Sequence, residues 1–177
     1  ASTAFATTYD VHDTRHPIGF GVRTGAWTGP YQAPLVGGHI KVRAAKWIGF
    51  NGFWDNAGMV KGNQVRHDHV IGFNGYFPRL LGNRRAYLSP TLGSCVDFRI
   101  TTPLDDRVPG SNDVLFGVHG GLAGEIALWH RLTFEASAEV FAYLGNQTGV
   151  DDWTASSSNT YRASAVGQLV AGINYAL

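Results

Sequence analysis

The sequence predicts an all-β fold: an eight-stranded, antiparallel, up-and-down transmembrane β-barrel with short turns at one end and long loops at the other. Only 15% of the 177 residues are charged, against roughly 25% in soluble domains, whereas 12% are aromatic and 23 are glycine. Residues alternate with a period of two along most of the chain, and the connections alternate in length. No apolar run approaches the roughly 20 residues of a transmembrane helix, so a membrane-spanning form must use strands.

Eight segments show the alternation. Several reach the roughly 9–11 residues that a tilted strand needs to cross a bilayer. In chain order they are residues 18–27, 36–45, 47–54, 70–77, 87–100, 114–128, 132–143 and 161–177. Pro90 costs a ladder hydrogen bond in the fifth segment, so we expect a bulge there.

The connections between these segments favour a membrane barrel over a soluble meander. Connections two and six are only "AK" and "WHR", and connection four, residues 78–86, is a somewhat longer turn. The other four are polar and long: "TGPYQAPL", "DNAGMVKGNQVRHD", "TTPLDDRVPGSND" and "GNQTGVDDWTASSSNT". Short turns at one end and long loops at the other are typical of transmembrane barrels, whose long loops are extracellular.

The content of the two faces predicts which one meets lipid. In segment 132–143, apolar and alanine residues occupy one parity, while Glu135 and Glu139 occupy the other. An uncharged parity suits lipid, where a Lys or Arg at the midplane costs about 2–4 kcal/mol. Enclosed charges must pair with one another. The predicted network of the lumen, the barrel interior, is Arg23, Lys41, Arg43, Asp97, Arg99, His119, Glu125, Glu135, Glu139 and Arg162.

The opposite assignment remains open at this point. In a soluble ligand-binding barrel of the lipocalin type the apolar parity faces inward and the charges are solvated. That alternative leaves the low charge and the Gly/Ser/Thr-rich polar parity unexplained. Leu115, Phe141, Val166 and Val170 do not follow our alternation, so the register is not fixed everywhere.

Aromatic residues at the segment ends predict two belts at the lipid–water interfaces. Trp47 and Trp129 lie at the two tightest turns. The belt at the opposite end would contain Trp27, Trp54, Tyr143 and Tyr161.

Processing and export are indicated by the chain start and by cysteine use. The only methionine is Met59, and the first residues, "ASTA", are small, as after signal-peptide cleavage. Cys95 is the only cysteine, so no internal disulfide or Cys/His metal site is expected. The 14 basic residues are scattered, which argues against nucleic-acid binding.

These features resemble the small outer-membrane β-barrels of Gram-negative bacteria, the group of the outer membrane protein A transmembrane domain. "KVRAAKWIGFNGFW" is similar to the family's strand–turn–strand unit, and "VHGGLAGEIALWHRLTFEASAEV" to its Gly-rich counterpart. The ending "GINYAL" resembles the signal read by the barrel-assembly machinery through Gly172, Tyr175 and Leu177, although Leu177 replaces the usual Phe. The resemblance covers roughly residues 18–177 and implies an outer-membrane location, with lipid and lipopolysaccharide as contacts.

Residues 1–17 are expected to form an N-terminal periplasmic tail before the barrel domain, residues 18–177. The tail is either mobile or a docking segment for another envelope protein, with Phe5, Tyr9 and Val11 as anchors. Such docking, or docking through the lipid-facing surface, would make the protein an accessory subunit of an envelope complex.

The expected function is structural or interactive: membrane integrity, contact with lipopolysaccharide, or contact with a partner. We predict no catalytic residues, metal or cofactor. The enzyme alternative is lipid A modification, which some small barrels perform; it would have to draw on His67, His69, Asp151, Asp152 and Ser156 to Ser158 in the loops. No His-x-Ser arrangement like that of the deacylase group is present, and "HDH" at 67–69 lacks a third metal ligand.

Overall fold

The computed structural model describes residues 15, 17–29, 32–61, 63–78, 81–105, 110–129, 131–148 and 159–177; the side chains at 61, 145–148 and 159–164 are not part of that description. No helix in these ranges is long and apolar enough to cross a membrane. Most of the predicted tail, residues 1–17, lies outside the described residues.

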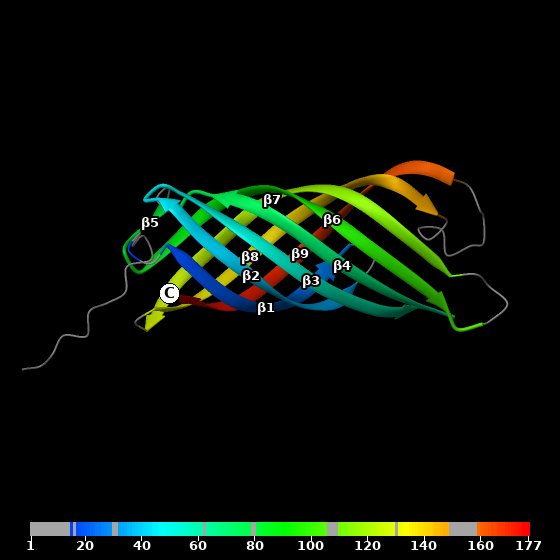
Figure 1. Cartoon of the computed structure of the whole chain (residues 1–177), viewed down its shortest axis with the longest axis horizontal. Helices are drawn as coiled ribbons and strands as arrows, with labels where there is room; N and C mark the ends of the chain where they lie inside the picture. The colour runs from blue at the N-terminus through cyan, green and yellow to red at the C-terminus, as the bar shows by residue number, and fades with distance from the viewer. Residues whose placement is uncertain are drawn as a thin grey trace, which may run out of the picture.

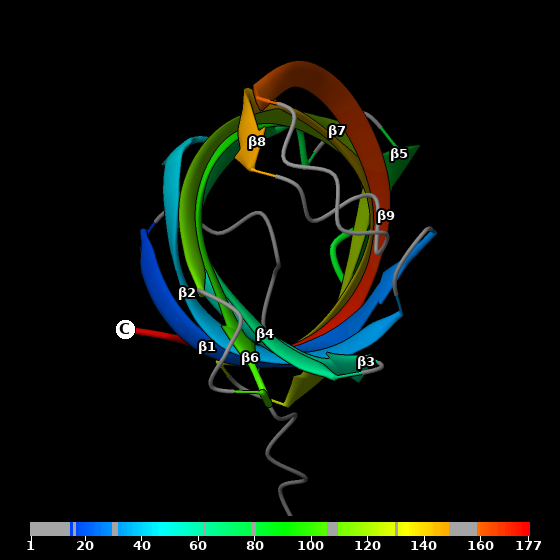
Figure 2. The same cartoon turned by 90° about the vertical axis from the view of Figure 1, so that its right-hand side faces the viewer.

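Eight long antiparallel strands and one short strand make up the described chain. Each long strand pairs with two other long strands, and β9 pairs with β1, so the sheet closes into a ring (Figures 1 and 2). The eight-stranded barrel is therefore confirmed. The strands are β1 (Ile18–Thr28), β2 (Ala33–Ala45), β3 (Ile48–Lys61), β4 (Gln64–Tyr76), β5 (Leu81–Gly82), β6 (Ala86–Pro103), β7 (Ser111–Trp129), β8 (Leu132–Thr148) and β9 (Asn159–Ala176).

One end of the barrel, here called the turn end, contains the β2–β3, β4–β6 and β7–β8 connections. The first and last strands also meet there, since Leu177 N donates to Ile18 O at 2.9 Å. Within the β4–β6 connection, β5 adds two pairs to β6, and Gly82 has a φ of 145°, which only glycine adopts readily. Asn83 Oδ1 then accepts hydrogen bonds from the backbone N of Arg85 (2.8 Å) and Ala86 (3.1 Å).

At the opposite end, here called the loop end, the predicted loops are too long. The "DNAGMVKGNQVRHD" segment is almost entirely strand, and β3 turns into β4 between the paired residues Lys61 and Gln64. Strands also extend into the other three predicted loops. The prediction took polar residues as a sign of loop, but Asp55, Arg66 and Asp68 are polar because they face the lumen.

The two faces of the wall have opposite chemistry. Phe50 is 44% exposed and Phe73 is 58% exposed on the outside, whereas Arg99 is 2% exposed on the inside. Large apolar side chains predominate on the outside of all eight long strands, whereas toward the loop end polar residues such as Asn56, His67 and Asn112 also face outward. The lipocalin-type alternative is therefore wrong, because it requires the apolar parity inside.

Pro90 does not mark a bulge. It pairs in register with Leu122, and the β6–β7 register is continuous from Ala86 to Thr101. On the other side of β6, β4 ends opposite Thr91 and β5 begins opposite Leu88. Pro90 thus lies between these two partners, where a missing N–H is tolerated.

Candidate functional site

The lumen is the part of the barrel richest in chemistry. Its side chains come from alternate residues of every long strand, and they form three ionic clusters and one apolar layer. Because an eight-stranded barrel has only enough interior for side chains, these groups fill it rather than line a channel.

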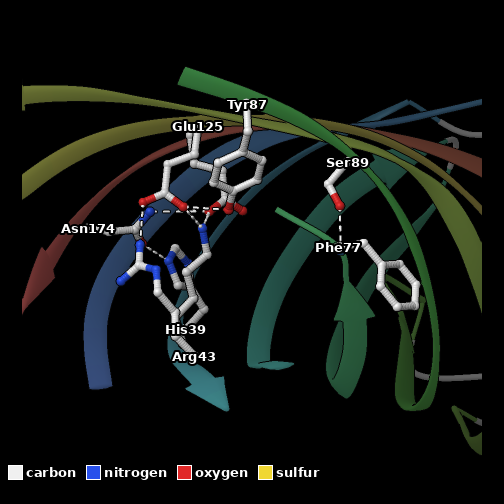
Figure 3. A network of polar contacts seen from close by, with 9 residues as sticks. His39, Arg43, Phe77, Tyr87, Ser89, Glu125 and Asn174 are labelled. Atoms are coloured by element: carbon white, nitrogen blue, oxygen red, sulfur yellow. Dashed lines mark hydrogen bonds and ion pairs between the residues drawn. The ribbon is translucent and has the colours of Figure 1, made fainter. Parts of the chain in front are cut away.

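The cluster nearest the turn end, the inner cluster, is centred on Glu125 of β7 (Figure 3). Glu125 is fully buried and accepts three bonds: from Lys41 Nζ (2.7 Å), Arg43 Nη2 (2.8 Å) and Tyr87 Oη (2.6 Å). Lys41 also pairs with Glu135, which accepts a bond from Asn174 Nδ2 at 3.2 Å. Five strands are thereby joined through one charge network.

Midway along the lumen, two acidic residues each collect several donors. Asp55 pairs with Arg23, whose Nε donates at 2.7 Å, and accepts a bond from Gln168 Nε2 at 2.9 Å. Glu139 lies 3.2 Å from His119 Nδ1 and accepts a bond from Thr91 Oγ1 at 2.9 Å. Asn74 Nδ2 also donates to Glu139, at 3.1 Å, so these contacts join three strands at Asp55 and four at Glu139. Both sets place donors beside a carboxylate whose burial would otherwise be costly.

The outer cluster lies toward the loop end on β4 and β6. Arg66 makes two bonds to Asp68, at 2.8 and 2.7 Å. Arg99 lies 3.4 Å from Asp68 and 3.2 Å from Asp97. Two guanidinium groups thus alternate with two carboxylates on one side of the wall.

An apolar layer, here called the aromatic plug, occupies the lumen between the middle and the loop end. Phe141 is stacked on His119, with ring centroids 4.5 Å apart, and meets Trp27 edge-on at 4.9 Å. The plug also contains Phe53, Leu115, Tyr143, Val166 and Val170. Leu115, Phe141, Val166 and Val170, which did not follow the expected alternation, are members of this plug. They face the lumen, as their parity predicts, but they are apolar.

The structure thus places nine of the ten predicted network residues in the lumen. They are Arg23, Lys41, Arg43, Asp97, Arg99, His119, Glu125, Glu135 and Glu139; the side chain of Arg162 is not described. The sequence analysis missed His39, Asp55, Arg66, Asp68 and Asp113, which are also buried. Continuing the parity of β3, β4 and β7 through the polar segments would have found the last four.

Of the aromatic residues predicted for the interface belts, some are exposed on the outside and others lie in the lumen. Trp47 and Trp129 at the turn end are 61% and 67% exposed, and Trp54 is exposed as well. Trp27 and Tyr143 instead belong to the aromatic plug, because their positions have the inward parity of β1 and β8, so assigning them to the belt was wrong. The side chain of Tyr161 is not described.

At the C-terminus, Tyr175 and Leu177 face outward and Gly172 faces inward. A Cβ on Gly172 would lie 2.7 Å from Val22 O and 3.1 Å from Arg23 Cβ, so the wall leaves no room there. These positions are compatible with an alternating terminal signal, which stays a prediction.

Of the groups considered for catalysis or metal binding, the structure describes His67 and His69. His67 and His69 lie in β4, not in a loop, and point outward; His69 Nδ1 lies 2.6 Å from Asn56 Oδ1. Across the described ranges, no three His, Cys, Asp or Glu side chains could hold a metal ion. Asp151, Asp152 and residues 156–158 lie outside those ranges.

Three solved structures share this fold at low sequence identity. Neisserial surface protein A (NspA) aligns with a TM-score of 0.54 and 13% identity, over 90% of this chain and 96% of its own. A major outer membrane protein from Thermus thermophilus aligns at 0.55 and 12%, over 92% and 100%. Ail, the attachment invasion locus protein of Yersinia pestis, aligns at 0.55 and 11%, over 90% and 96%.

No protein-family model and no curated protein sequence matches the chain. At these identities the structural likeness establishes the fold, that of small bacterial outer-membrane barrels. An apolar outer surface around a charged interior is what a bilayer requires of such a barrel. Fold and surface together are those of a membrane-spanning barrel of the bacterial outer-membrane type.

Proposed function

We propose that the protein is a non-enzymatic outer-membrane barrel with an interaction role: its loop end presents strand edges and polar side chains to an envelope partner or to lipopolysaccharide. The observation that carries this proposal is the uneven height of the barrel wall at that end. The β1–β2 hairpin is short, and the strands on both sides of it continue beyond it.

The pairing registers define this step in the wall. The β1–β9 pairing stops at Thr28 and Gly167, whereas β9 continues to Asn159, paired with β8. The β2–β3 pairing stops at Leu35 and Ala57, whereas β3 continues to Lys61, paired with β4. Figure 1 shows the longer strands of the loop end on the right.

Two strand edges therefore flank the short hairpin, one on β3 at residues 58–61 and one on β9 at residues 159–166. A strand edge offers backbone N–H and C=O groups in a row and can accept an extended segment as an additional strand. Beside the β3 edge, Asn56, His67 and His69 face outward and could contact sugar or phosphate groups.

The filled lumen supports the non-enzymatic part of the proposal. Among the described residues, the carboxylates of the inner cluster are held by several donors each, an arrangement that stabilises the barrel. A role as accessory subunit would use the loop end, the lipid-facing surface or the N-terminal tail.

The test is extraction of the tagged protein from intact envelopes in native lipid particles. We expect one envelope protein, or lipopolysaccharide, to co-purify with the wild type and to be lost from a variant with Asn56→Ser, His67→Ser and His69→Ser. A Trp47→Phe variant, altered at the turn end, should retain it. Mass spectrometry of lipid A with and without the protein tests the enzyme alternative; a changed acyl pattern would contradict our proposal.

A further inference from the structure

Two adjoining hollows mark the lipid-facing surface over β6, β7, β8, β9 and β1. The first is lined by β5 and Asn83 and by Leu88, Gly124 and Ala136. The second shares these last three residues and continues to Ala171 and Thr24. The hollows form one continuous depression, here called the trench.

The register explains the trench. Leu88, Gly124, Ala136, Ala171 and Thr24 are direct neighbours in one row across five strands. Four of these five residues are small. The neighbouring row on the turn-end side carries larger side chains that form a ridge: Ile126, Phe134, Ile173 and Val22. On the other side Leu122 and Leu169 rise above Ala138.

The trench begins near the turn end at β6 and lies progressively further from that end as it crosses to β1. Leu88 lies two residues after the start of β6 at Ala86, whereas Thr24 lies six residues after the start of β1 at Ile18. Four inter-strand spacings of about 4.8 Å give it a length of about 19 Å. That exceeds half of the roughly 30 Å hydrocarbon core, so one acyl chain of one leaflet can lie along it.

Basic residues lie at the end of the trench nearest the turn end, here called its mouth. Arg84 and Arg85 follow directly after Asn83 in the turn that lines it, and both are exposed. The turn is ordered: Ala127 N donates to Arg85 O at 2.7 Å, and Asn83 holds the backbone N of Arg85. Lys46 and Arg131 are exposed in the other turns of this end, and no acidic residue occurs at 44–47, 77–86 or 128–132.

We propose that the trench and the Arg84–Arg85 turn bind one anionic phospholipid of the periplasmic leaflet. One acyl chain lies in the trench between the two ridges, and the phosphate contacts the guanidinium groups at its mouth. Guanidinium groups donate paired hydrogen bonds to phosphate. The excess of basic over acidic residues in these turns favours a lipid with net negative charge over a zwitterionic one.

Native mass spectrometry of the detergent-extracted full chain tests this binding, with phosphatidylglycerol and phosphatidylcholine as the added probes. We expect the wild type to retain one phosphatidylglycerol in preference to phosphatidylcholine. Arg84→Gln with Arg85→Gln should lower phosphatidylglycerol affinity roughly tenfold, to the level of phosphatidylcholine. Ala136→Leu with Ala171→Leu, which fills the trench, should abolish retention of both lipids.

Two variants serve as controls: Ala165→Leu, on the same lipid-facing parity of β9 but outside the trench, and Lys61→Gln at the loop end. Both should retain phosphatidylglycerol like the wild type. Each variant is first checked for the folded, heat-modifiable form, so that lost binding is not lost folding. Retention by the Ala136→Leu/Ala171→Leu variant overturns the proposal. Equal retention of both lipids by the wild type would also overturn it. A wild-type dimer that the Ala136→Leu/Ala171→Leu variant disrupts would overturn it too, because the trench would then bind a second copy of the chain.

Discussion

Glu125 shows how one side chain can hold several strands. It is fully buried, and its two oxygens accept bonds from Lys41, Arg43 and Tyr87, which come from β2 and β6. At this burial such a carboxylate is stable only because its donors surround it, and the donors in turn depend on it. Glu135, in contrast, shares Lys41 with Glu125.

We therefore expect Glu125→Gln to destabilise the barrel by about 3–5 kcal/mol, because Arg43 and Lys41 lose a shared carboxylate in the interior. Glu135→Gln should cost less, since Lys41 keeps Glu125. Urea unfolding of both variants in lipid vesicles, followed by tryptophan fluorescence, measures the difference. Equal losses would show that the inner cluster does not depend on Glu125.

Individual strands show the same division on their two faces. On β7, Val118 is exposed near the middle of the strand, and Asn112 has the same outward parity near the loop end. Parity and depth together therefore decide what a substitution costs.

Val118→Arg should destabilise the barrel by about 2–4 kcal/mol, because it places a charge in hydrocarbon, whereas Asn112→Arg should cost at most about 1 kcal/mol near the interface. Reversible unfolding in bilayers of phosphatidylcholine gives both values. If the two substitutions cost the same, the outer face at Val118 is not in contact with lipid.

Most of the strands could be predicted because lipid contact leaves a clear alternation in sequence. Their loop-end extensions could not, since there the alternation is between one polar residue and another: Asp55 faces the lumen, Asn56 faces outward, and composition alone resembles a loop. The predicted lumen residues followed from parity. Their partners did not, because a contact such as Lys41 with Glu125 joins strands that are not neighbours.

The β3–β4 hairpin offers a direct test of those extensions. Asn56 pairs with His69 and Gly58 with His67 in a regular ladder, and β4 is paired on both sides at residues 65–69. The amides of residues 65–69, and those amides of residues 56–60 that point toward β4, should therefore be protected from hydrogen exchange. Exchange measured by NMR in detergent micelles should be slower there than at Arg84, which lies in the connection between β5 and β6. Equally fast exchange in the hairpin and in the reference would mean that the hairpin is the long loop that the sequence analysis predicted.

For the whole molecule, closure is what makes the fold possible in lipid. A sheet left open between β1 and β9 would expose unpaired N–H and C=O groups to hydrocarbon, where each costs several kcal/mol. The closing seam runs from Gly19 with Ala176 to Thr28 with Gly167, ten residue pairs in register. Residues at the two ends of the barrel sequence are therefore direct neighbours in space.

A cross-link across the seam tests closure. Val22 and Ile173 are paired and both face outward, and paired Cα atoms lie about 4.5–5.5 Å apart, within the range of a disulfide. Val22→Cys with Ile173→Cys should therefore oxidise within one chain. After boiling without reductant, the cross-linked chain should migrate faster on a denaturing gel than the reduced chain. Val22→Cys with Val118→Cys, on β1 and β7, should not cross-link within the chain, because β8 and β9 separate these strands. Absence of the Val22–Ile173 cross-link in folded protein would mean that β1 and β9 are not paired, and the barrel would have to close elsewhere or not at all.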